Sequence, residues 1–256
     1  MPNNDIWNAA AAAAYDTPGV GIFAADLLAA TVARLQGLAA DGAALEFAIG
    51  TGRVAIPLWA AGVPVSGIEL SPAMVAELRG KARDSIPVLI GDMASVQVPG
   101  AFTLVYLVFN TISNLLTQAE QIARFRNAAR HLTPGGCFVI ELWVPQLPLP
   151  PPEPQAVAVR AGAGYLLVDV FDVAAQGVVS HHVRFDADGA AQLFRSPHRY
   201  VWPAELDLMA QLAGFTLESR AADWVGTSFD AAARGHVSVY RLPGRAPGTG
   251  HDSRGR

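Results

Sequence analysis

Three carboxylates and a pair of glycines are spaced so that they would surround one cationic ligand. Glu46 lies in a short apolar segment that runs into Gly50 and Gly52. Glu69 ends the next apolar segment, and Asp92 ends the one after it. The glycines would let a ligand lie directly on the backbone, because they carry no side chain. The carboxylates would bind hydroxyl groups, amino groups or positive charge on that ligand.

The order of apolar and helical segments predicts the sheet that would bring these residues together. Five short runs are apolar at nearly every position, which is typical of strands buried on both faces of a parallel sheet. Helical start signals lie between them: Ser71 precedes Pro72, and Thr117 with Glu120 forms a capping box. This alternation predicts an α/β, doubly wound, Rossmann-like fold. The predicted strands are 43–49, 65–70, 86–92, 104–109 and 137–143.

Ligands of such sheets bind at the carboxyl ends of the strands, where Glu46, Glu69 and Asp92 would all lie. The stretch 50–55 also follows the dinucleotide pattern G-x-G-x-x-A, and a tight turn alone would also explain its glycines. A pyrophosphate, however, would lie unfavourably beside Glu46. A cationic, phosphate-free ligand with an amino-acid part, a ribose and an adenine accounts for all three carboxylates. S-adenosylmethionine (SAM) is such a ligand.

The stretch 46–52, with the sequence EFAIGTG, resembles the E/D-x-G-x-G-x-G signature of class I SAM-dependent methyltransferases. Ala48 stands in place of the first glycine. The resemblance implies SAM as cofactor and a sheet of about seven strands whose last strand is antiparallel. It extends over about residues 40–145 and resumes at the final strands. The whole chain, including the stretches 109–116 and 199–215, is similar to actinobacterial small-molecule methyltransferases, among them those that act on amino sugars.

The same resemblance assigns cofactor contacts to single residues. It implies that Glu69 binds the ribose, with Leu70 against the adenine. It also implies that Asp92 binds the adenine amino group, with Met93 beside it. Thr103 opens the fourth strand where many members have an acidic residue, so it receives no role. The predicted cofactor-binding residues are Glu46, Ala48, Gly50, Gly52, Glu69, Leu70, Asp92, Met93 and Asn110.

The composition argues against several other classes of protein. The chain has 256 residues, 52% of them hydrophobic and 16% charged, with a formal net charge of −4. This balance argues against nucleic acid or a membrane surface as partner, and no apolar run is long enough to span a bilayer. The single cysteine, Cys137, allows neither an internal disulfide nor a thiolate metal site, and the histidines lack metal-ligand spacing. We therefore expect a cytoplasmic protein that binds a small molecule and no metal.

The composition changes after the fifth predicted strand, which indicates an insertion into the α/β domain. Residues 145–154 include six prolines, as in a stiff connector. Turn sequences then separate three predicted strands of an antiparallel sheet, which would serve as a lid, a substrate surface or a dimer contact. These strands are 164–173, 178–185 and 190–196. The predicted units are a SAM-binding core (1–145 and 199–243, with a helical cover over one sheet edge from 1–40), the insert (155–198) and a disordered tail (244–256).

Two adjacent histidines in the insert are the candidate general bases. If the AAQG turn at 174–177 pairs Val173 with Val178, Asp169 falls opposite His182 and would orient its imidazole. Alternation then places His181 on the other, apolar face. We rank His182 first and His181 second as catalytic residues. An exposed ion pair for His182 and a buried structural role for His181 are the alternatives, and a one-residue slip would exchange the faces.

Residues at the ends of the fourth and fifth predicted strands would contact the methyl acceptor. Asn110 follows the fourth strand, with turn capping as its alternative role. Glu141 is unusual in an otherwise apolar fifth strand, although a strand end can simply reach water. Tyr15 would close over the cofactor or pack on the surface, and His198 and Arg199 precede a predicted helix. The predicted substrate-binding residues are Tyr15, Asn110, Glu141, Trp143 and Arg199.

The function that best fits these residues is methyl transfer from SAM to O, N or C of a small molecule, such as a natural product or an amino sugar. Catalysis would depend mainly on holding acceptor and methyl group in line. One alternative is an NAD(P)-dependent oxidoreductase, which the glycine pattern and Glu69 favour although no Tyr-x-x-x-Lys set is visible. Another is a SAM-binding regulatory protein that does not methylate. A homodimer through the inserted sheet is a further expectation.

Overall fold

The computed structural model describes residues 7–19, 21–147, 156–162 and 164–244. Its helices are α1 (Ala9–Ala13), α2 (Ala25–Ala39), α3 (Ala55–Ala60), α4 (Pro72–Ala82), α5 (Gln118–His131) and α6 (Pro203–Leu212), with short 3-10 turns η2 (Gly21–Phe23) and η3 (Thr111–Asn114). Its strands are β1 (Ala44–Phe47), β2 (Val65–Glu69), β3 (Val88–Ile90), β4 (Phe102–Leu107), β5 (Leu132–Trp143), β6 (Ala156–Gly162), β7 (Tyr165–Asp172), β8 (Gly177–Phe185), β9 (Ala191–Arg199), β10 (Thr216–Ala221) and β11 (Gly235–Arg241). Most of the predicted proline-rich connector and of the predicted tail lies outside the described residues.

Seven strands form one sheet in the order β10-β11-β5-β4-β1-β2-β3. The strands β1 to β5 pair in parallel, whereas β11 runs antiparallel to β5 and to β10. The predicted doubly wound α/β fold with an antiparallel last strand is therefore confirmed. The helix starts are also as predicted, because the Ser71 hydroxyl accepts a hydrogen bond from the amide of Met74 and Thr117 with Glu120 forms a complete capping box.

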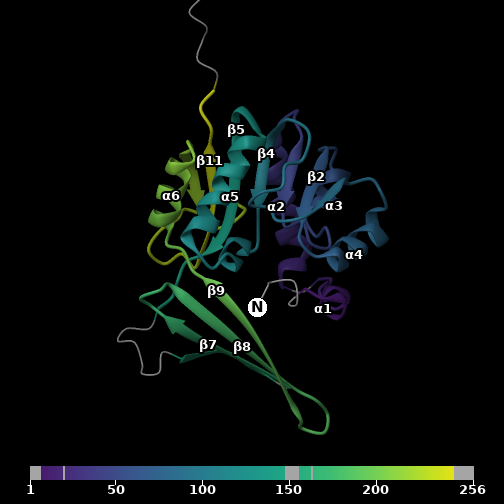
Figure 1. The fold of residues 1–256 in the computed structure, drawn as a ribbon, viewed down its shortest axis with the longest axis vertical. Coiled ribbons are helices and arrows are strands. Elements are labelled where there is room, and N and C mark those ends of the chain that lie inside the picture. The colour runs from purple at the N-terminus through teal and green to yellow at the C-terminus, as the bar shows by residue number, and fades with distance from the viewer. Residues whose placement is uncertain (1–6, 20, 148–155, 163, 245–256) are drawn as a thin grey trace, which may run out of the picture.

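Helices cover both faces of this sheet (Figure 1). Buried side chains of α2 and α3, such as Leu35 and Leu58, pack on one face, and those of α5 and α6, such as Phe125 and Met209, pack on the other. The prediction that residues 1–40 cover a sheet edge is wrong for α2, which packs against the central strand β4. The reason is that β4 lies in the middle of the sheet, between β5 and β1. The short helix α1 instead contacts α4 at the end of the core that faces the insert.

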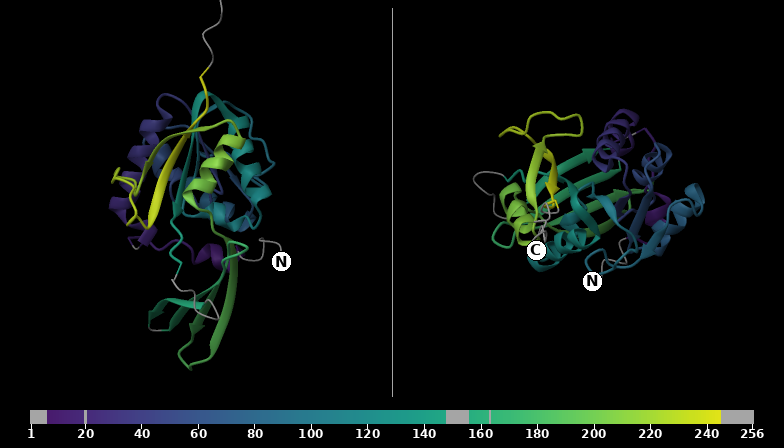
Figure 2. Two further views of the ribbon diagram at one scale, coloured as in Figure 1. Left: turned by 90° about the vertical axis from the view of Figure 1, so that its left-hand side faces the viewer. Right: turned by 90° about the horizontal axis from the view of Figure 1, so that it is seen from above.

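The insert is an antiparallel sheet of four strands, in the order β6-β7-β8-β9. Figures 1 and 2 show it projecting from the core as a separate layer, which we call the lid. The prediction of three strands missed β6, because its sequence AVAVRAG lies next to the proline-rich segment and consists mainly of Ala, Val and Gly. The lid is inserted in the chain between β5 and α6.

The register of the central lid hairpin differs from the predicted one. Asp169 pairs with Ser180, and His182 pairs with Leu167. The prediction that Asp169 lies opposite His182 is therefore wrong, because the hairpin closes at Asp172 and Gly177 and Asp169 lies opposite Ser180, two residues before His182. Residues two apart in a strand point to the same face, so Asp169, Ser180 and His182 still share one face of the sheet.

Candidate active site

A left-handed loop follows β1 at the carboxyl edge of the sheet. Ala48, Gly50 and Gly52 have φ values of 52°, 58° and 83°, a backbone conformation that favours glycine. The carboxylate of Glu69 accepts hydrogen bonds from the amides of Gly50 (2.8 Å) and Ser71 (2.9 Å). It is thereby held at the open side of the loop. Burial raises the pKa of Glu69, and the two amide hydrogen bonds oppose this effect.

Glu46 lies beneath the loop and is only 3% exposed. Its carboxyl group accepts a hydrogen bond of 2.9 Å from the Tyr106 hydroxyl, and the backbone amide of Ala55 also contacts it. Burial raises the pKa of Glu46 to about 8. A positively charged ligand above the loop would favour the ionised form of this carboxyl group.

The third carboxylate, Asp92, is held by a residue of α5, the helix that packs with α6 on one face of the sheet. Asp92 accepts hydrogen bonds of 2.8 Å from the Arg124 guanidinium and from the amide of Ala94. The Arg124 side chain is 1% exposed, whereas that of Asp92 is 56% exposed, so the aspartate presents its outer side to solvent at the sheet edge. The side chain of Asn127 donates to the carbonyl of Met93. Sequence reasoning missed Arg124 and Asn127, whose local pattern resembles that of any amphipathic helix.

The N-terminal segment closes over this edge of the sheet. The Ser71 hydroxyl donates to the carbonyl of Trp7 (2.7 Å), and the Thr51 hydroxyl donates to Asp16 (2.6 Å). Tyr15 lies edge-on between Trp7 and Phe23, at centroid distances of 5.6 and 5.9 Å. Burial raises the pKa of Tyr15. Tyr15 lines the small cavity together with Gly50 and Glu69.

Two cavities meet below this N-terminal cover. A small one of about 70 Å³ includes the left-handed loop and Glu69 in its walls. A large one of about 970 Å³ extends from there under the lid. Both are lined by Trp7, Tyr15, Thr111 and Asn114. A group bound in the small cavity would therefore be adjacent to a molecule bound in the large one.

The inward face of the lid supplies most of the polar groups of the large cavity. Asp169 accepts a hydrogen bond of 2.6 Å from the Ser180 hydroxyl. The Ser196 hydroxyl lies between two imidazoles, 3.1 Å from Nε2 of His182 and 3.0 Å from Nε2 of His198. Burial lowers the pKa of both histidines below the ordinary value of 6.5, which favours neutral rings at neutral pH.

Two imidazole nitrogens of the lid have further partners. Nδ1 of His182 lies 2.6 Å from the Tyr165 hydroxyl, and Nδ1 of His198 lies 3.1 Å from Oδ1 of Asn114 in η3. A continuous series of hydrogen bonds therefore runs from Tyr165 on the lid to Asn114, one of the four residues that line both cavities. His181, the second predicted base, pairs with Val168 and Arg195 on the outer face of the lid and lies away from the cavity.

The remaining predicted acceptor contacts fall into two groups. Asn110 and Trp143 line the large cavity, and the Asn110 side chain accepts a hydrogen bond from the amide of Trp143 (2.7 Å). Glu141 instead accepts hydrogen bonds from the amide of Phe109 (2.8 Å) and the Trp224 indole (3.0 Å). It supports the turn after β4, in which Phe109 and Asn110 both have positive φ.

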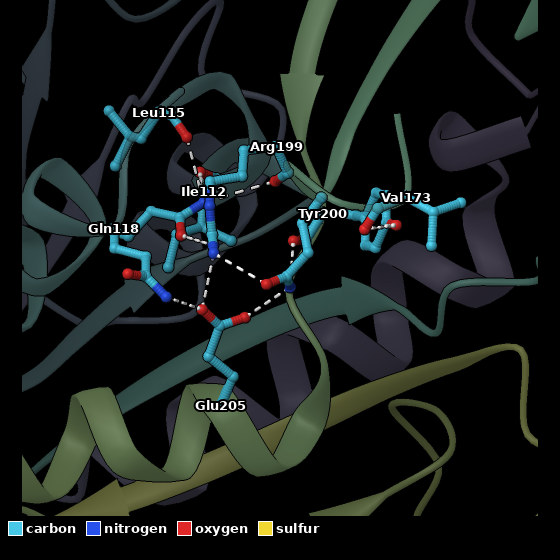
Figure 3. A network of polar contacts seen from close by, with 9 residues as sticks. Ile112, Leu115, Gln118, Val173, Arg199, Tyr200 and Glu205 are labelled. Atoms are coloured by element: carbon cyan, nitrogen blue, oxygen red, sulfur yellow. Dashed lines mark hydrogen bonds and ion pairs between the residues drawn. The ribbon is translucent and has the colours of Figure 1, made fainter. Parts of the chain in front are cut away.

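Arg199 anchors the lid to the core. Its guanidinium forms a 2.7 Å ion pair with Glu205 of α6 and donates to Gln121 of α5 at 2.6 Å. Figure 3 shows Arg199 and Glu205 facing each other, with Gln118 beside the glutamate. Arg199 is 6% exposed and is not among the residues that line either cavity.

In the described part of the chain, no group of three acidic, histidine or cysteine side chains is placed to hold a metal ion. No described helix has both the length and the apolar character to cross a membrane.

Known proteins share this architecture. The family model described as a methyltransferase domain matches residues 44–136. The CcbJ methyltransferase from Streptomyces caelestis is 35% identical, with a TM-score of 0.74 over 84% of this chain and 89% of that one. SAM-bound CalS10, an amino pentose methyltransferase from Micromonospora echinaspora involved in calicheamicin biosynthesis, is 24% identical, with a TM-score of 0.64 over 84% of this chain and 90% of that one. The cypemycin N-terminal methyltransferase of Streptomyces sp is 27% identical over 91% of this chain and 96% of its own length.

A Rossmann-like sheet with an antiparallel last strand and an acidic nucleoside site at its carboxyl edge defines the class I methyltransferases. The chain belongs to the SAM-dependent methyltransferase family, as represented in actinobacterial biosynthetic pathways. It is an enzyme with SAM as its methyl donor. The predicted cofactor and activity are thereby confirmed, and the oxidoreductase and non-catalytic alternatives are set aside. The residues that line the small cavity fit this cofactor, because they include the carboxylate of Glu69 and the open backbone at Gly50, and no Lys or Arg.

Proposed function

We propose that the enzyme methylates the amine nitrogen of a small molecule bound in the large cavity. The observation that carries this proposal is that this cavity adjoins the small one and holds one carboxylate, Asp169, beside two imidazoles whose pKa is lowered. A carboxylate would bind an ammonium group, and a neutral imidazole would take up its proton. The similarity to an amino pentose methyltransferase and to the cypemycin N-terminal methyltransferase supports the same acceptor class.

The predicted cofactor contacts are part of this proposal. SAM, when bound, supplies a methyl group on a sulfonium centre. Glu69 and the left-handed loop would hold its ribose and amino-acid part, and Asp92, Leu70 and Met93 would bind its adenine. Glu46 would act from beneath the loop through its charge. The residues proposed for the cofactor are Glu46, Ala48, Gly50, Gly52, Glu69, Leu70, Asp92, Met93 and Asn110.

The walls of the large cavity would position the amine for in-line attack. Tyr15, Trp143 and Phe194 supply aromatic surface, and Asp169 would hold the ammonium group before it loses its proton. Most of the rate enhancement in such a displacement comes from holding the two reacting atoms close and aligned. Glu141 and Arg199 would act indirectly, by supporting the β4 turn and the lid.

The acceptor class is tested with matched pairs of compounds. Amino sugars and short peptides with free N-termini are incubated with enzyme and SAM, beside the same sugars with hydroxyl groups and the same peptides with acetylated N-termini. We expect release of demethylated cofactor only with the free amines, and mass spectrometry should place the methyl group on nitrogen. Methylation of a hydroxyl compound at equal or greater rate would contradict the proposal.

We propose in addition that a second copy of the chain covers the outer face of the lid. The outward positions of the two central lid strands include Leu166, Val168, Val179 and Val183. No helix of the described chain forms a second layer there (Figures 1 and 2). A largely apolar sheet face requires packing, and homodimer interfaces are more apolar than transient ones. An identical face related by a two-fold axis would pack such a surface on itself.

Light scattering during size-exclusion chromatography tests this second proposal. The wild-type enzyme should have the mass of a dimer, and Val179→Glu should have the mass of a monomer, because a charge would be buried in the contact. Leu212→Glu is the matched control, since Leu212 is 61% exposed on α6 of the core. A monomeric wild-type enzyme would overturn the proposal.

A further inference from the structure

We infer that Ser196 and His198 are the proton-accepting pair of the large cavity, with Asn114 as the residue that positions them. This inference rests on the proposed amine acceptor and specifies how its proton leaves. His182, predicted from the sequence as the general base, becomes a positioning residue in this inference. The argument comes from the direction of each hydrogen bond between Tyr165 and Asn114.

The tautomer of His198 follows from its partner in η3. Oδ1 of Asn114 is a carbonyl oxygen and only accepts hydrogen bonds, so Nδ1 of His198 carries the hydrogen and donates across 3.1 Å. A neutral imidazole has one donor and one acceptor nitrogen. Nε2 of His198 is therefore the acceptor, and the Ser196 hydroxyl donates to it across 3.0 Å.

The tautomer of His182 follows in turn. Because the Ser196 hydrogen is directed to His198, Nε2 of His182 must donate to the Ser196 oxygen across 3.1 Å. Nδ1 of His182 is then the acceptor, and the Tyr165 hydroxyl occupies it at 2.6 Å. His182 has no lone pair left for a substrate proton. It instead fixes the orientation of the Ser196 hydroxyl.

The Ser196 oxygen retains one acceptor position, because a hydroxyl oxygen accepts two hydrogen bonds and His182 supplies one. Ser196 lines the large cavity, so an ammonium group there would donate an N–H to this oxygen. In the transfer step, that N–H bond breaks and its proton joins the Ser196 oxygen. At the same time the former hydroxyl proton moves to Nε2 of His198. The products are a neutral amine, whose lone pair is free to attack the methyl group, and an imidazolium on His198.

The surroundings of His198 suit this role. Asp169 on β7 faces it and favours the imidazolium, whereas His182 on β8 opposes it and burial disfavours it. The directly paired residue on β8 is Val178, and η3 contributes the uncharged Asn114. Since Asn114 lines both cavities, the proton acceptor lies at the end of the lid that is nearest to the cofactor.

The tautomers are tested without any acceptor. Long-range proton–nitrogen NMR spectra of the ¹⁵N-histidine-labelled enzyme near neutral pH should show His198 with hydrogen on Nδ1 and His182 with hydrogen on Nε2. Substitution of each histidine in turn assigns the signals. A His198 ring with its hydrogen on Nε2 would overturn the inference, because no acceptor nitrogen would then face Ser196.

Single-turnover rates with the amine found by the acceptor screen supply the second test. Ser196→Ala and His198→Gln should each lower the rate at neutral pH by about tenfold, because only about a tenth of an amine with a pKa of ~8 is neutral at pH 7, with SAM affinity unchanged. His181→Gln is the matched control on the outer face and should stay within about threefold of the wild type. If Ser196→Ala and His198→Gln also stayed within about threefold of the wild-type rate, the inference would be overturned.

The pH profile separates this inference from the proposed function. Above the pKa of the acceptor amine (~8 for an α-amine), the amine is already neutral and needs no base. The rates of Ser196→Ala and His198→Gln should therefore approach that of the wild type at high pH. A loss that persists there would contradict the proton-transfer role. If the screen instead finds a hydroxyl acceptor, the proposed function fails while the tautomer assignment still stands or falls on the NMR spectra.

Discussion

The hydroxyl of Thr51 donates a 2.6 Å hydrogen bond to the carboxylate of Asp16, and this contact joins the N-terminal segment to the loop after β1. The two residues are 35 positions apart in the chain. Asp16 also forms an ion pair with Lys81 of α4 at 2.6 Å. The N-terminal segment is thereby held across the small cavity from two sides.

Removal of Asp16 should speed cofactor release. Asp16→Ala removes the charged hydrogen bond to Thr51, which for a partly exposed pair would be worth about 1 kcal/mol. We expect the demethylated cofactor to dissociate roughly five times faster, as measured by stopped-flow tryptophan fluorescence. Lys81→Met is the control, because it removes the ion pair but keeps the hydrogen bond to Thr51. Equal dissociation rates in Asp16→Ala and the wild type would show that the segment does not retain the cofactor.

Replacement of Ala48 by glycine should stabilise the protein. Ala48 has φ +52°, and a left-handed conformation is unfavourable by about 1–2 kcal/mol for a residue with a Cβ atom. Glycine would remove that strain but lose about 0.5–1 kcal/mol through the entropy of the unfolded chain. A net gain of about 0.5–1 kcal/mol in the free energy of unfolding should appear in urea denaturation. Ala44→Gly, in the buried extended strand β1, should be destabilising instead.

Loss of the Arg199–Glu205 ion pair should loosen the lid. Arg199→Met leaves Glu205 without its charged partner in a largely buried site, which typically destabilises by about 3–5 kcal/mol. Amide hydrogen exchange should speed up in β8 and β9 more than in β1 and β4. The double variant Arg199→Met, Glu205→Leu should recover part of the protection, since no unpaired charge then remains.

An exposed ion pair serves as the control for the lid anchor. Arg241 and Glu218 have side chains that are 33% and 39% exposed. Arg241→Met should therefore lower stability by less than about 1 kcal/mol. Uniform exchange in lid and core of Arg199→Met would be inconsistent with a local anchor.

His236 should make the protein less stable in acid. The residue is 1% exposed, and its Nε2 has no hydrogen-bond partner among the described residues. Burial, and then the charge of Arg220, lower its pKa from 6.5 to about 4. Between these values the unfolded chain binds more protons than the folded one, so stability falls as the pH falls. The expected slope from this residue is about 1.4 kcal/mol per pH unit.

The variant His236→Phe isolates this contribution. It keeps an aromatic ring against Phe229, which lies edge-on to His236 at 5.8 Å, and it cannot be protonated. The free energy of unfolding of the variant should fall less steeply with decreasing pH between about 6.5 and 4. Parallel slopes for variant and wild type in urea titrations would place the acid sensitivity elsewhere.

The sequence by itself determined the sheet and the cofactor class of this protein. The apolar runs that became β1, β2 and β4, the cap at Ser71 and the capping box at Thr117 are local signals. They act over a few residues, so each can be recognised without its tertiary partners. The motif over 46–52 is equally local, and it places the left-handed loop and Glu69 at one edge of the sheet.

Only the tertiary structure decided how the acceptor cavity is built. The partner of His198 is Asn114, which is 84 residues away in the chain, and Glu141 is engaged by Trp224, which is 83 residues away. The lid register, which places Asp169 opposite Ser180 and not opposite His182, depends on where one hairpin closes. Such contacts are chosen by the packing of whole elements, and a shift of one residue exchanges the faces of a strand. For this reason the residue types indicate a methyltransferase, while the partners of His198 and Glu141 are seen only in the folded chain.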